Sequence, residues 1–229
     1  MNALQSTIAL CVIPGVCLYV PAVAAAAVFT PLGGKRTVHM IGELSAFNLE
    51  DQTNTSTVFD RGDVGLPGDL GHLKLGMDIG LLEGNCFAQG VASQNFVVLD
   101  DSINFSGLAD VNISGTSAFP YSLNGTGGAF GEVEYKFAVA GQQKARLAMN
   151  SQVGAYKEDD FTFKLNASDG RVLWSGTAIV DEGGNTYRDY ETDLSLAEGQ
   201  YTISVQMRAS SYILNDLSSP GRTLANFSI

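Results

Sequence analysis

Apolar and polar side chains alternate along much of this chain, as is typical of half-buried β-strands. In residues 200–209 the apolar positions all have one parity and the polar positions the other. The side chains predicted to be buried there are Tyr201, Ile203, Val205 and Met207. Residues 133–139 repeat the alternation. Further predicted strands are residues 37–41, 94–99, 103–106, 110–114, 145–149, 161–166, 172–175 and 224–229.

Turn signals between these segments predict antiparallel hairpins. Asp169 and Gly170 separate two apolar runs, and glycine readily adopts the positive φ that such turns need. Residues 158–160 and 181–182 are acidic and are interpreted as solvent-facing turns. Helical spacing with a cap at both ends is missing from every window of a dozen residues. We therefore predict an all-β fold, an antiparallel two-sheet β-sandwich that is jelly-roll-like, with about ten strands.

The N-terminal segment predicts export from the cytoplasm. Residues 9–27 are mostly apolar and end in small residues, as in a cleavable signal helix, and we place cleavage near Ala24–Ala27. The first basic residue is Lys35, so an uncleaved membrane anchor is the alternative. We predict a signal peptide over residues 1–26 and a single β-sandwich domain over residues 27–229.

Charge and cysteine content narrow the classes of function. The chain has a formal net charge of −11, and its 13 basic residues form no cluster, which argues against nucleic-acid binding. Cys11 and Cys17 would leave with the signal peptide. Cys86 would then remain as a buried apolar side chain without a disulfide. We expect a secreted protein, extracellular or at the cell surface, that is not membrane-bound after cleavage; the oligomeric state stays open.

The best-defined part of the predicted domain, residues 129–229, resembles a known type of exported module. Residues 160–165, 168–173 and 196–205 are similar to the C-terminal half of exported bacterial jelly-roll modules. These modules are of the pre-peptidase C-terminal type or belong to surface proteins with a PEP-CTERM sorting tag. The most recognisable phrase is Leu-x-x-Gly-x-Tyr-x-Ile-x-Val, which begins at Leu196. The resemblance implies a non-catalytic extracellular module; the chain departs from the pattern in that no sorting tag precedes Ile229.

Two groups of carboxylates are candidate metal ligands. Asp189, Glu191 and Asp193 occupy every second position, so on a strand they would share one face. They could bind calcium, act as a general acid and base, or protect a solvent-facing edge, and we favour the last interpretation. Asp60 and Asp63 flank Arg61 and Gly62 in a glycine-rich stretch that predicts an exposed loop. This loop could bind calcium, be recognised by a receptor, or simply expose its charges to solvent, and we favour the last interpretation.

Aromatic and asparagine residues provide the remaining candidates. Tyr187 and Tyr190 are predicted to lie in a loop, where their rings could stack on sugars, whereas Trp174 is predicted to pack in the core. Six Asn-x-Ser/Thr triplets are interpreted as solvent-facing strand positions, with glycan attachment as the alternative. Their asparagines are Asn54, Asn104, Asn112, Asn124, Asn166 and Asn226.

The hypotheses that follow are of three kinds. We favour an exported, non-catalytic β-sandwich that acts as a cell-surface or matrix structural or interaction protein, with extracellular protein or polysaccharide as partner. The alternative is a carbohydrate-binding module that uses Tyr187 and Tyr190, assisted by calcium. A glycan-directed enzyme with the carboxylates near Asp189 is the third. The chain has two histidines and no recognisable catalytic motif, so we predict no catalytic residues and no cofactor other than calcium.

Overall fold

A computed structural model describes residues 28–65, 71–81, 86–116, 119–154, 159–179, 186–214 and 217–229. It also gives two short antiparallel strands near the N-terminus, β1 (Ala9–Ile13) and β2 (Val16–Tyr19). Otherwise the predicted signal peptide, residues 1–26, lies outside the described residues and stays a prediction. Within the described part of the chain, no helix is long and apolar enough to cross a membrane.

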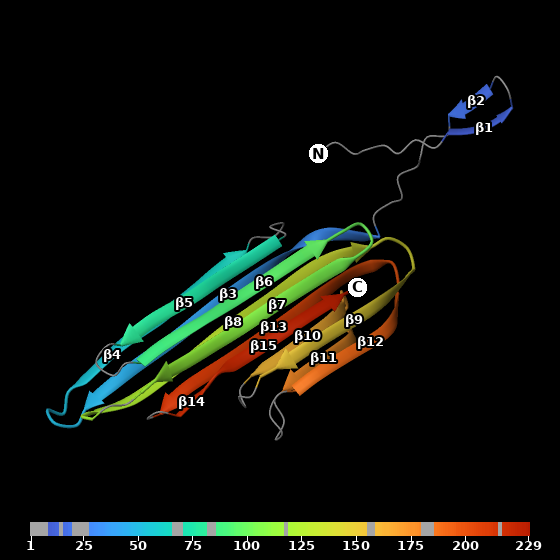
Figure 1. The fold of residues 1–229 in the computed structure, drawn as a ribbon. Coiled ribbons are helices and arrows are strands. Elements are labelled where there is room, and N and C mark those ends of the chain that lie inside the picture. Colours follow the sequence, from blue (N-terminus) through green and yellow to red (C-terminus); the bar gives the residue numbers. More distant parts are fainter. Residues whose placement is uncertain are drawn as a thin grey trace.

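Two antiparallel sheets pack face to face (Figure 1). The strand order of sheet 1 is β11 (Val172–Ile179), β10 (Asp160–Ala167), β13 (Gly199–Leu214), β8 (Tyr121–Val139), β3 (Phe29–Asn48) and β4 (Asn54–Gly65). The short β14 (Leu217–Ser219) pairs with β13. The strand order of sheet 2 is β12 (Thr186–Leu196), β9 (Gln143–Val153), β15 (Gly221–Ser228), β7 (Ile103–Gly115), β6 (Cys86–Val98) and β5 (Gly71–Leu81). The predicted all-β, antiparallel two-sheet sandwich is confirmed.

The core forms where the inward-facing positions of the two sheets meet. The four side chains predicted to be buried in residues 200–209 all lie there, as do those of residues 133–139. Aromatic rings from both sheets contact one another at the centre; Phe96 of β6, for example, lies 4.7 Å from Tyr135 of β8 between ring centroids. Cys86 is also fully buried, as predicted, and this burial raises the pKa of its thiol.

The predicted hairpin between β10 and β11 is also confirmed. Gly170 has a φ of 84°, in the left-handed region that glycine tolerates.

The first long strand of the sandwich was predicted only in part. The predicted strand covers residues 37–41, whereas β3 runs for 20 residues. Its inward positions include Arg36 and Gly42, which interrupt the apolar alternation, yet pairing with β8 continues along the whole strand.

The loop predicted around Arg61 is wrong. The Arg61-Gly62-Asp63 tripeptide lies within β4, where Gly62 pairs with His39 and Asp63 pairs with Val38. β4 is an edge strand of sheet 1, and edge strands accept the charged residues and glycines that the sequence suggested for a loop. Asp63 is exposed, but it belongs to a regular ladder rather than to a turn.

The interpretation of residues 158–160 as a solvent-facing turn is wrong for Asp159. Its side chain is 1% exposed, and its two carboxylate oxygens accept backbone hydrogen bonds. Oδ1 accepts from Ser210 N at 2.7 Å, and Oδ2 accepts from Arg222 N at 3.1 Å. Since Ser210 belongs to β13 and Arg222 to β15, this carboxylate joins the two sheets at the start of β10.

Candidate functional site

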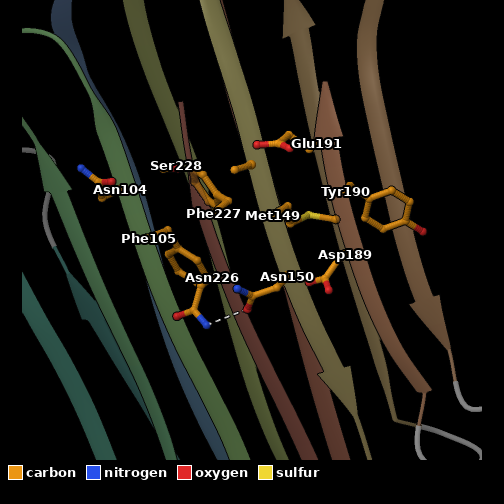
Figure 2. A pocket seen from close by; sticks show the side chains of 11 residues that line it. Asn104, Phe105, Met149, Asn150, Asp189, Tyr190, Glu191, Asn226, Phe227 and Ser228 are labelled. Atoms are coloured by element: carbon orange, nitrogen blue, oxygen red, sulfur yellow. Dashed lines mark hydrogen bonds between the residues drawn. The ribbon is translucent and has the colours of Figure 1, made fainter. Parts of the chain in front are cut away.

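A shallow hollow of about 520 Å³ lies on sheet 2 (Figure 2). It extends over β12, β9, β15 and β7. Its lining residues are Asn104, Phe105, Ala148, Met149, Asn150, Asp189, Tyr190, Glu191, Asn226, Phe227 and Ser228. The polar side chains among them are exposed or half-buried, whereas Phe105, Met149 and Phe227 are buried and support the sheet from the core side. We call this hollow the sheet 2 groove.

Strand register explains why the groove is polar. Among its lining residues, Glu191 pairs with Ala148, and Ser228 pairs with both Ala148 and Asn104. The methyl group of Ala148 is the smallest of these side chains, and its partners Glu191 and Ser228 are both polar. The register therefore places polar side chains from β12, β15 and β7 around one small outward residue on β9.

The neighbouring row carries polar side chains across all six strands. From β12 to β5, cross-strand pairing places in one line Asp189, Asn150, Asn226, Ser106, Asn95 and His72. We call this line the polar row. Within it Asn226 Nδ2 donates a hydrogen bond to Asn150 Oδ1 at 2.9 Å (Figure 2). This bond leaves Nδ2 of Asn150 as a donor and Oδ1 of Asn226 as an acceptor for a ligand above the sheet.

The carboxylates of β12 share one face, as predicted. Asp189, Glu191 and Asp193 all point outward from this edge strand, where the favoured interpretation placed them. Arg146 Nη2 lies 2.5 Å from Glu191 Oε1, and both side chains are largely exposed. The hydrogen bond and the charge of Glu191 raise the pKa of Arg146, and the charge of Asp193 adds to this effect.

The described residues include no group of three His, Cys, Asp or Glu side chains placed to hold a metal ion. The other predicted metal ligands, Asp60 and Asp63, lie on β4. This strand belongs to sheet 1, whereas β12 belongs to sheet 2. Asp60 Oδ1 is 2.7 Å from His39 Nε2, and Asp63 Oδ1 accepts a hydrogen bond from Val64 N at 2.9 Å. The structure thus does not bring the two acidic groups together, and calcium binding stays a prediction.

The prediction that the two candidate tyrosines lie in a loop is wrong. Their rings also do not form one shared surface. Both belong to β12, three positions apart, so their side chains point to opposite faces of the strand. Tyr190 is half-buried and packs edge-on against Trp174, with ring centroids 5.4 Å apart. Tyr187 is 61% exposed on the same outer face as Asp189, beside the polar row. Trp174 also packs against Phe163, which confirms its predicted place in the core.

Sequence reasoning missed the polar row, although one signal for it was present. All six asparagines of the Asn-x-Ser/Thr triplets are exposed or half-buried on strands, as predicted. Two of them, Asn104 and Asn226, line the sheet 2 groove. The alignment of Asn226 with Asn150 depends on pairing between strands far apart in the sequence, which the triplets do not reveal.

No family model matches the chain, and a search of curated proteins finds no match. The resemblance of residues 129–229 to exported bacterial jelly-roll modules therefore stays a prediction.

Proposed function

We propose that this protein is exported and acts by binding, without catalysis, at the cell surface or in an extracellular matrix. We further propose that the sheet 2 groove contacts polysaccharide. The observation that carries the proposal is the polar row, which aligns amide, hydroxyl and carboxylate groups beside an open groove. Such groups can donate and accept hydrogen bonds in the paired manner that neighbouring sugar hydroxyls require.

The shape of the site favours a polymer as ligand. Small-molecule sites enclose most of their ligand, whereas this groove is open along the sheet. A chain of sugar units could lie across β12, β9, β15 and β7, with contacts repeated from strand to strand. Tyr187 is placed beside the polar row, where its exposed ring could stack on one sugar of such a chain.

The surroundings of the carboxylates favour binding over hydrolysis. A glycosidase needs two carboxyl groups that flank the scissile bond, one of which donates a proton to the leaving oxygen. Glu191 is instead paired with Arg146, and its side chain is 57% exposed in an open groove. Asp189 and Glu191 are therefore assigned contacts with sugar hydroxyls, not proton transfer.

The test is a binding measurement on a panel of neutral and acidic polysaccharides by affinity electrophoresis. We expect at least one polysaccharide to retard the protein, and Asn150→Ala to weaken binding about tenfold by removing paired hydrogen bonds. Asn124→Ala is the matched control, since Asn124 is exposed on the outer face of sheet 1. Tyr187→Ala tests the stacking contact separately.

Three outcomes would overturn the proposal. If no polysaccharide retards the protein, or if the Asn150 and Asn124 variants bind equally well, the groove is not the binding site. If polysaccharide is cleaved, and cleavage is lost in both Asp189→Asn and Glu191→Gln, the protein is an enzyme rather than a binding protein.

A further inference from the structure

The four edge strands of the sandwich differ in how they are protected. An edge strand exposes unpaired backbone N–H and C=O groups, and charged side chains are a common means of preventing another strand from pairing there. The charged or ionisable residues of β4 are Asp60, Arg61 and Asp63; those of β5 are His72, Lys74 and Asp78; those of β12 are Arg188, Asp189, Glu191 and Asp193. Three of the four edges thus carry this protection.

The fourth edge, β11, has none. Its sequence, Val-Leu-Trp-Ser-Gly-Thr-Ala-Ile, contains no charged residue and no proline. One side of β11 pairs with β10, and no other described strand pairs with its second side. Ser175 and Thr177 are exposed on its outer face, and Ile179 is 60% exposed near its end. By the usual rule for sheet edges, β11 is open to pairing with another strand.

We propose that β11 pairs antiparallel with β11 of a second copy of this chain, which joins the two copies of sheet 1 into one continuous sheet. A two-fold axis perpendicular to the sheet keeps the outer faces of both copies on the same side. Outward residues must then pair with outward residues, and inward with inward. An axis through Gly176 meets this condition, because it pairs Ser175 with Thr177 and Trp174 with Ala178 of the second copy.

The side chains of this register fit one another. Ser175 and Thr177 would place hydroxyl groups side by side on the outer face, where such cross-strand pairs are favourable. On the inner face a large side chain, Trp174, would lie opposite a small one, Ala178. Gly176 would face its own symmetry mate, and the ring of Trp174 already covers the space next to Gly176 within one copy. β11 thus complements itself, which favours a second copy over an unrelated strand.

Charge limits the pairing to sheet 1. β12 lies on the same side of the sandwich as β11, as the contact between Trp174 and Tyr190 shows. The carboxylates of β12 would lie on the same outer face as those of the second copy and near them, and like charges oppose the joining of sheet 2. The net charge of −11 on each chain acts in the same direction. Added salt should therefore strengthen the dimer by screening this repulsion.

Sedimentation velocity on the exported protein, over a series of concentrations, tests the proposal with two matched variants. Ser175→Lys adds a charge to the β11 edge, whereas Ser56→Lys adds the same charge to an exposed position on β4, the opposite edge of the same sheet. We expect a dimer that Ser175→Lys weakens at least about tenfold. Ser56→Lys should leave the dissociation constant unchanged.

The single tryptophan provides an independent signal. Trp174 lies on β11 at the proposed interface, so its fluorescence should shift with protein concentration in the wild type and in Ser56→Lys. In Ser175→Lys the shift should disappear. Thr177→Glu serves as a second edge variant should Ser175→Lys fail to fold, which circular dichroism would show.

The proposal is overturned if the protein is monomeric at every concentration and salt level, or if a dimer survives both edge variants. A dimer that Ser56→Lys weakens as much as Ser175→Lys would also overturn it, because the interface would then not be specific to β11. This inference does not depend on polysaccharide binding, since the sheet 2 groove and β11 belong to different sheets.

Discussion

Gln94 shows how a polar side chain is accommodated inside the sandwich. It lies on β6 and is buried, and its Nε2 donates hydrogen bonds to the backbone oxygens of Thr37 at 3.0 Å and Glu132 at 3.1 Å. These two carbonyls belong to paired residues of the opposite sheet. Gly131 leaves room for this contact, because a Cβ there would lie 2.8 Å from Gln94 Nε2. The buried position of the Gln94 side chain thus requires a glycine at position 131, which is 37 positions away in the sequence.

Tyr135 is a second polar group in the core, with a different environment. Its ring packs against Phe96 and Phe137, and its hydroxyl finds no hydrogen-bond partner among the described residues. Burial raises the pKa of Tyr135 to about 12. The folded state therefore keeps its proton at pH values where the unfolded chain has lost it.

This shift predicts a loss of stability at alkaline pH. The unfolded state binds fewer protons than the folded state between the ordinary tyrosine pKa of about 10 and the raised value, so the free energy of unfolding falls as the pH rises through this interval. We expect Tyr135→Phe to reduce the loss between pH 9 and pH 11 by about 1 kcal/mol. Urea denaturation at both pH values measures it. Tyr187→Phe, at an exposed position, is the control; an equal effect of both variants would refute the assignment to Tyr135.

At the scale of elements, the strand ends are held by contacts that no local pattern predicts. The start of β10 is joined to both sheets through Asp159, a residue that looks like part of an acidic turn in the sequence. Its carboxylate replaces the ladder partners that the N–H groups of Ser210 and Arg222 would otherwise need. A buried N–H group without a partner is costly, so these bonds matter more than a surface charge would.

Removal of this carboxylate should destabilise the protein strongly. We expect Asp159→Ala to lower the free energy of unfolding by about 3 kcal/mol, because the buried N–H group of Ser210 and the partly buried N–H group of Arg222 lose a charged acceptor. Asp101→Ala, in the exposed hairpin between β6 and β7, should change it by less than about 0.5 kcal/mol. Chemical denaturation of both variants measures the difference. Similar values for the two would show that Asp159 does not join the sheets.

At the scale of the whole molecule, one prediction concerns the start of the mature chain. If the chain is exported, as we propose, we expect the mature protein to begin near residue 27, because the apolar segment ends in the small residues that signal peptidase sites require. N-terminal sequencing or intact mass measurement of protein recovered from the medium would check this. Recovery of the complete chain from the membrane fraction would instead support the alternative of an uncleaved anchor.

The sequence by itself determined the fold class and the buried faces of two central strands, β13 and β8. Alternation with a period of two is a local property, and residues 200–209 and 133–139 carry it within a single strand length. Turn chemistry is equally local, as Gly170 shows. Arg36 and Gly42 interrupt the alternation in β3, so the sequence pattern does not predict the full length of this strand.

Only the tertiary structure decided which strands are neighbours and which are edges. Asn150 and Asn226 are 76 positions apart, and nothing near either residue specifies their pairing. The same holds for the unprotected edge at β11 and for the burial of Asp159. Such features depend on long-range hydrogen bonding and on the packing of one sheet against the other, so they arise only when the whole chain has folded.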